Sequence, residues 1–73
     1  MKTDVAGLMK VITRQGMTVE AIAKKIGINR STFYRKLSSD GEKFTIGEVH
    51  RMVDALPITT EEAVHIFLAD NSQ

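Results

Sequence analysis

The stretch AIAKKIGINRSTFYRKL, residues 21–37, decides the fold, because two short helical patterns meet within it. The first has apolar Ala21, Ile22 and Ile26 on one side, and Gly27 after it suits the left-handed conformation that ends a helix. The second pattern starts after a three-residue connection, which is the spacing of a helix-turn-helix. We therefore expect a helix-turn-helix at about residues 18–37, with small Ala21 at the close approach of its two helices.

The second helix of this unit, Arg30–Leu37, combines a narrow apolar side with a charged outer face. Asn29 precedes it as an N-cap, and Phe33 and Leu37 lie four positions apart, so both face the core. The side chains left outside are Arg30, Ser31, Tyr34 and Arg35, with Thr32 and Lys36 at the borders. Cations and hydrogen-bond donors on one helix suit the major groove of duplex DNA, where Arg binds guanine in bidentate fashion. An ordinary solvated helix is the alternative.

The segments on either side of this unit also have helical patterns, and strand signals are absent. Before it, Thr3 is the expected cap of a helix that stops at Gly16. After it, capping boxes at residues 45–48 and 59–62 open two more helices, the last of which runs through Ala69. The sequence thus predicts an all-α, compact five-helix domain whose short helices cross at steep angles.

Size and composition bound the class of protein. The chain has 73 residues and no Cys, so we expect a single domain, residues 1–73, whose core comes from apolar side chains. No stretch approaches the roughly 20 apolar residues of a membrane span, and the amino terminus lacks the apolar run of a signal peptide. We expect a cytoplasmic protein with no membrane partner, and fraying of residues 70–73.

Charge is distributed unevenly along the chain, although the net charge is only +1. Residues 14–36 hold six Lys and Arg against Glu20 as the one acid. Residues 40–73 hold seven Asp and Glu against Lys43 and Arg51. This asymmetry indicates one face that binds a polyanion, and two ordinary solvated faces are the alternative.

Residues 17–37, with a capped helix after them, resemble the Cro and repressor family of helix-turn-helix proteins, which is common in bacteriophages and bacteria. The resemblance covers roughly residues 5–56, and its marks are Thr18, Glu20, Ala23, Ile26, Gly27, Ile28, Ser31 and Thr32. It implies a lambda-repressor-like fold and a Cro-like phage or prophage regulator, in the bacterial cytoplasm, that binds a double-stranded DNA operator in a sequence-specific way. Val19 departs from the family, because many members have Gln at this position.

The resemblance also assigns roles to individual residues. Family members read bases with the first, second and sixth residues of the helix, which are here Arg30, Ser31 and Arg35. They clamp DNA phosphates with the start of the preceding helix and with the following loop. The expected backbone-contacting or supporting residues are Thr18, Asn29, Thr32, Tyr34, Lys36, Ser38 and Lys43. Some phage regulators of this shape grip a partner repressor protein instead, so an antirepressor is the second function that the sequence allows.

Other combinations of residues give no support for catalysis or for a bound metal ion. His50 and His65 lie far apart with no Cys near them, and Glu62 with His65 forms a single Glu-x-x-His where di-iron bundles need more. No nucleophile, base and orienting residue form a set. We therefore expect no enzyme activity, no cofactor and no metal, and we place Glu62 in a surface salt bridge.

The last expected helix is apolar over about half its circumference, which is wider than one core-facing stripe needs. Its Ala63 and Phe67 are expected in the core together with either Val64 or Ile66. A second chain usually covers such a patch, and two-fold operators favour a symmetric dimer. We therefore expect a homodimer whose candidate contacts are Val64, Ile66 and Leu68, and deep burial of the helix in its own domain is the alternative.

Overall fold

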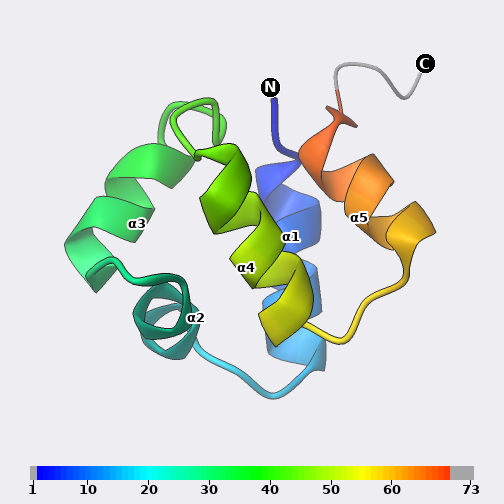
Figure 1. Cartoon of the computed structure of the whole chain (residues 1–73), viewed down its shortest axis with the longest axis horizontal. Helices are drawn as coiled ribbons and strands as arrows, with labels where there is room; N and C mark the ends of the chain where they lie inside the picture. Colours follow the sequence, from blue (N-terminus) through cyan, green and yellow to red (C-terminus); the bar gives the residue numbers. More distant parts are fainter. Residues whose placement is uncertain (1, 70–73) are drawn as a thin grey trace.

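Five helices surround an apolar core in residues 2–69, the part of the chain that this computed structural model describes (Figure 1). The helices are α1 Val5–Arg14, α2 Val19–Ile26, α3 Arg30–Leu37, α4 Ile46–Ala55 and α5 Thr60–Phe67. Within these residues there is no strand, which confirms the all-α prediction. No helix in this range has the length and the apolar character to cross a bilayer. The predicted fraying of residues 70–73 falls outside the described residues.

Side-chain caps begin the helices where the sequence predicts them, with one exception. Thr18, Asn29, Thr45 and Thr59 each accept a hydrogen bond from the amide three residues later, at 2.8–3.1 Å. The exception is α1, because its N-cap is Asp4, whose Oδ1 accepts from the Gly7 amide at 3.0 Å. The expectation that Thr3 caps this helix is therefore wrong, and so is the extension of α5 to Ala69.

The amino-terminal segment joins two distant parts of the fold. The Thr3 amide donates to the Asp40 carbonyl in the α3–α4 loop at 2.8 Å, and the Asp4 amide donates to the Ile66 carbonyl of α5 at 2.7 Å. Thr3 is buried, and its side chain lies next to Gly41 of that loop and not at the start of α1. The loop after α3 is consequently fixed to the rest of the molecule at the end far from α2 (Figure 1).

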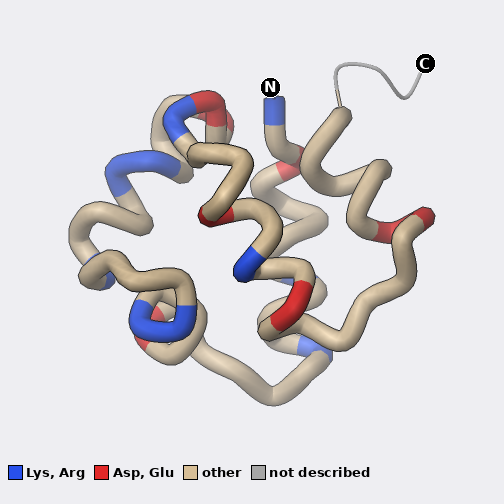
Figure 2. Tube along the Cα trace, in the orientation of Figure 1, with Lys and Arg blue, Asp and Glu red and all other residues tan. Residues whose placement is uncertain are grey.

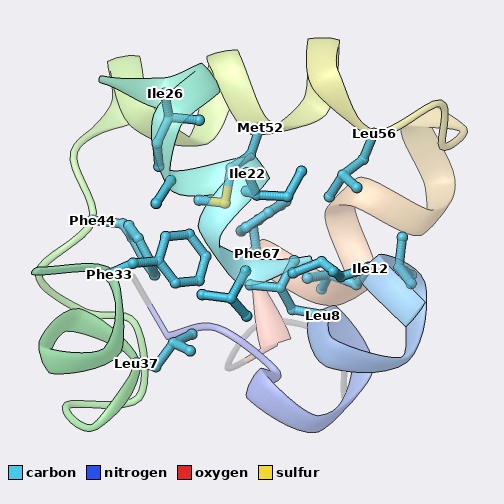
Figure 3. Packing of buried hydrophobic residues seen from close by; sticks show 14 residues of the cluster. Leu8, Ile12, Ile22, Ile26, Phe33, Leu37, Phe44, Met52, Leu56 and Phe67 are labelled. Carbon is cyan, nitrogen blue, oxygen red and sulfur yellow. The ribbon is translucent and has the colours of Figure 1, made fainter. Parts of the chain in front are cut away.

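All five helices contribute side chains to the core, and α3 contributes Phe33 and Leu37 (Figure 3). Phe33 is fully buried, and its ring meets Phe44 edge to face with centroids 5.3 Å apart. The largest fully buried side chains are Phe33, Leu8, Ile12, Ile22, Ile26, Met52 and Leu56. Ala23 is 1% exposed whereas Ala21 is half-buried, so the small residue deep in the packing of α2 is Ala23 and not, as expected, Ala21.

Candidate nucleic-acid interface

The helix-turn-helix consists of α2, a sharp turn and α3. Gly27 ends α2 in the left-handed conformation, with a φ of 89°, which a side chain would disfavour. The Ile28 amide then donates to the Ala23 carbonyl at 3.0 Å, and Asn29 caps α3 by accepting from the Thr32 amide at 2.8 Å. Each of these contacts is local, and together they set the angle at which α3 leaves α2.

A side chain from α4 also holds this turn. Arg51 Nε donates to the Ile26 carbonyl at 3.1 Å, so a cation caps the carboxyl end of α2, where the helix dipole favours positive charge. Sequence reasoning missed this contact because the partner is a backbone carbonyl 25 positions away. The turn before α3 is therefore held both by its own residues and by α4.

The exposed face of α3 carries the residues expected to contact bases. Arg30, Ser31 and Arg35 are exposed, and Tyr34 is 50% exposed, while Phe33 and Leu37 point into the core. The predicted orientation of the helix is thus the one that the structure has. Polar and cationic groups cover this face from its first turn to its last, which suits a ligand with many acceptors.

The carboxyl end of α3 and the loop after it form an open hollow of about 440 Å³. It is lined by Thr32, Arg35, Lys36, Ser38, Ser39 and Lys43. Among the ion pairs of the described residues, none involves Arg35 or Lys43. The structure therefore brings the expected backbone-contacting residues Thr32, Ser38 and Lys43 together beside a base-reading candidate.

The remaining expected contacts lie elsewhere or are occupied. Thr18 is exposed at the start of α2, and its hydroxyl accepts from the Ala21 amide at 3.1 Å. Lys36 lines the hollow, but its ammonium nitrogen lies 2.7 and 2.8 Å from the two carboxylate oxygens of Glu48. Lys36, which the sequence places at the border of the outer face as a supporting residue for DNA binding, is thus paired with an acid of the same protein.

The charges are only partly separated in space, because acidic residues also lie in the α3–α4 loop beside Lys43 and along α4 (Figure 2). Figure 2 shows Lys and Arg along α2 and the end of α3, and acidic residues at the start of α5 on the opposite side of the molecule. Arg14, one of the six basic residues of segment 14–36, forms an ion pair with Glu62, in which its guanidinium lies 2.9 Å from the carboxylate. This pair confirms the surface salt bridge expected for Glu62, and it lowers the pKa of that carboxyl. No cluster of three metal-ligating side chains occurs in residues 2–69.

Glu48 should make the stability of the fold dependent on pH. Burial raises the pKa of Glu48, but hydrogen bonds from Lys36 and from the Thr45 amide outweigh it and hold the pKa below the ordinary value of a glutamate. A carboxyl whose pKa is depressed by folding stabilises the native state above its unfolded pKa and loses that contribution as the pH falls. We expect thermal melts to show falling stability below about pH 5. The Glu48→Gln variant should have a flatter profile, and an unchanged profile would contradict this assignment.

The structure shows which of Val64 and Ile66, the two β-branched apolar residues of α5, faces the core. Ile66 is 6% exposed and belongs to the core, so its place among the dimer contacts is wrong, whereas Val64 is 45% exposed. Val64 and Leu68 border an almost wholly apolar hollow of about 230 Å³ between α4 and α5. Its other lining residues are Val49, Val53, Thr60, Ala63 and Phe67. The apolar surface that sequence reasoning placed on α5 alone is thus shared with α4.

Residues 7–40, which include most of α1, all of α2 and α3 and the start of the following loop, match the family described as the helix-turn-helix domain of resolvase. The match spans just under half of the chain. It supports a helix-turn-helix DNA-binding domain, in agreement with the geometry, and does not single out the Cro and repressor family. The chain has no significant match among curated proteins or solved structures.

Proposed function

We propose that this protein is a sequence-specific DNA-binding transcriptional regulator that reads the major groove with α3. The observation that carries the proposal is the exposed set of Arg30, Ser31 and Arg35 on a helix that a fixed turn presents to solvent. In this position each Arg can donate two hydrogen bonds to guanine O6 and N7, and Ser31 can reach a base edge. The family match over residues 7–40, which include these three, also supports DNA binding.

DNA phosphates on either side of the groove are the proposed ligands of the surrounding hydroxyls and cations. Ser38 and Lys43 lie beside Arg35 in the hollow at the end of α3, and Thr18 stands at the start of α2. Such contacts fix the register of a protein on the duplex and carry no sequence information themselves. Acidic residues at the start of α5 would lie on the side away from the DNA (Figure 2).

The finer form of the proposal is a Cro-like repressor of phage or prophage origin that acts as a homodimer. It is supported by the marks of that family in α2 and α3 and by the apolar hollow between α4 and α5, next to exposed Val64. In Figure 1 α5 lies at the opposite side of the molecule from α3, so a second copy placed there would leave both reading helices free. Each of the two helices α3 would then meet one half-site of a palindromic operator.

Replacing either arginine should weaken binding to a specific duplex. We expect Arg30→Ala and Arg35→Ala each to cost about 1–3 kcal/mol and to relax the base preference nearby, because each removes a bidentate contact. Selection from a random duplex library with the wild-type protein supplies the target, and fluorescence anisotropy measures the affinity. Lys10→Ala, an exposed cation on α1 behind α4, is the control and should bind the selected duplex within about twofold of the wild type. Wild-type affinity in both arginine variants would refute the assignment of α3.

A charge placed in the α4–α5 hollow should disrupt the proposed dimer. We expect Val64→Glu to weaken self-association by about tenfold or more, because its carboxylate would be desolvated without a partner. His65→Glu, one position along α5 and also exposed, adds a similar charge outside the hollow and should have little effect. Sedimentation at micromolar concentration beside a thermal melt separates association from folding. A wild-type monomer both free and on DNA would contradict the dimer and leave the hollow to a partner repressor protein.

A further inference from the structure

The two apolar anchors of α3 leave one degree of freedom that matters for reading DNA. Phe33 and Leu37 lie four positions apart and therefore nearly on one line along the helix. Anchors on a line resist translation and tilt, but they resist rotation of the helix about that line much less. A small rotation would carry the ends of the long Arg30 and Arg35 side chains sideways across a base pair. Some contact away from this line is needed to fix the rotation.

Lys36 supplies such a contact. At 3.6 residues per turn it stands about 80° around the helix from the centre of the line through Phe33 and Leu37. Its Nζ lies 2.7 and 2.8 Å from the two oxygens of Glu48, and 5.9 Å from the centre of the Phe44 ring. The side chains of Lys36 and Glu48 are only 18% and 9% exposed, so little water screens the pair.

Glu48 is itself held in place by the start of α4. Its Oε1 accepts from the Thr45 amide at 2.9 Å, and its amide donates to Thr45 Oγ1 at 3.0 Å, which completes a capping box. A carboxylate fixed in this way cannot follow Lys36 if α3 rotates. The pair therefore fixes the rotation of α3 relative to α4. The same helix, α4, also holds the turn before α3 through Arg51.

We propose that Lys36 and Glu48 form a tether that sets the rotation of α3 and so determines the sequence specificity of the base-reading face. The proposal rests on the DNA-reading role of α3 argued above. Lys36 is then a positioning residue that acts through Arg30 and Arg35, although it lies on the reading helix and carries a positive charge. A phosphate contact by Lys36 is the competing role, and the two differ in what they do to sequence preference and to salt dependence.

The double variant Lys36→Met/Glu48→Gln tests the tether without leaving a buried charge unpaired. Met retains much of the Lys stem, Gln still serves a capping box, and the net charge of the protein is unchanged. We expect affinity for the duplex selected by the wild type to fall roughly 10-fold, the loss of about one bidentate base contact. Affinity for a scrambled duplex should stay the same, and so should the slope of log affinity against log salt concentration. The melting temperature reports whether the fold is intact.

Lys43→Met is the matched control, because Lys43 is an exposed cation of the same hollow with no ion pair among the described residues. It should weaken both duplexes alike and reduce the salt slope by about 1. If the Lys36→Met/Glu48→Gln variant behaves like Lys43→Met, or keeps the wild-type preference, the tether is refuted.

If the wild type itself selects no sequence, the proposed function fails, and residual dipolar couplings, which report the orientation of α3 in the folded protein, then test the tether without DNA. Identical α3 couplings in the wild type and the double variant would overturn it.

Discussion

Phe33→Ala should lower the free energy of unfolding by about 3–5 kcal/mol, the largest loss that we expect from a single substitution in this protein. The side chain is fully buried, and its ring is the deepest contact that α3 makes with the core (Figure 3). Alanine would remove that contact and the edge-to-face interaction with Phe44, and it would leave a cavity. Because a small domain has a total stability of only about 5–15 kcal/mol, chemical denaturation should show a protein close to unfolding.

Tyr34→Ala is the matched control for this prediction. It removes a ring of similar size from the next position of the same helix, but that ring is 50% exposed, so we expect a change within about 0.5 kcal/mol. Circular dichroism during urea titration measures both variants. Equal stability of the two variants would mean that α3 is rotated and that its charged face is not the one presented to DNA.

Local features of the fold could be predicted from the sequence because their causes lie within a few residues. Each cap accepts a hydrogen bond from the amide three positions later, so the residue types within a few positions are enough to identify it. The caps found in this way are Thr18, Asn29, Thr45 and Thr59. The same holds for Gly27, whose left-handed conformation ends α2. The bounds of α3 follow directly from such signals, which is why the exposed face of α3 was predicted correctly.

Contacts between distant segments could not be predicted in this way. Lys36 and Glu48 lie 12 positions apart, and nothing near either residue identifies the other as its partner. Thr3 looks like a helix cap by its type, yet its place is decided by the loop carbonyl of Asp40, which only the folded chain brings near. A cap is predicted from the residue type and its near neighbours in sequence. The prediction is wrong where the same residue instead makes a contact with a distant segment of the chain.

Similar residues two positions apart on a helix form a second class of errors. Ala21 and Ala23 are both small, and Val64 and Ile66 are both branched, so hydrophobic pattern alone does not decide which member of each pair faces inward. The answer depends on the rotation of the helix, which its neighbours set. In α5 the rotation of the helix buries Ile66 in the core and leaves Val64 at the apolar hollow. It therefore determines which of the two residues is a candidate dimer contact.

Gly41→Ala should lower the free energy of unfolding by about 2–4 kcal/mol, for two separable reasons. Gly41 has a φ of 71°, which L-residues disfavour, and a Cβ built on it would stand 2.5 Å from the Thr3 side chain. Relief of that overlap would require the amino-terminal segment to leave the loop and would break the bond from the Thr3 amide to Asp40. The loop that carries Ser38 and Lys43 would then lose its attachment to the far side of the molecule.

Gly16→Ala separates the two reasons, because Gly16 has nearly the same φ, 70°, but nothing within 4 Å of the added Cβ. It should cost only the conformational part, about 1 kcal/mol, so the difference between the two variants measures the contact with Thr3. In the Thr3→Gly/Gly41→Ala double variant the overlapping atoms of Thr3 are absent, and part of the stability should return relative to Gly41→Ala alone. Urea titration followed by circular dichroism measures all three. Equal losses in Gly16→Ala and Gly41→Ala would show that the amino-terminal segment does not pack on the loop, and the attachment of the α3–α4 loop to α5 would have to be abandoned.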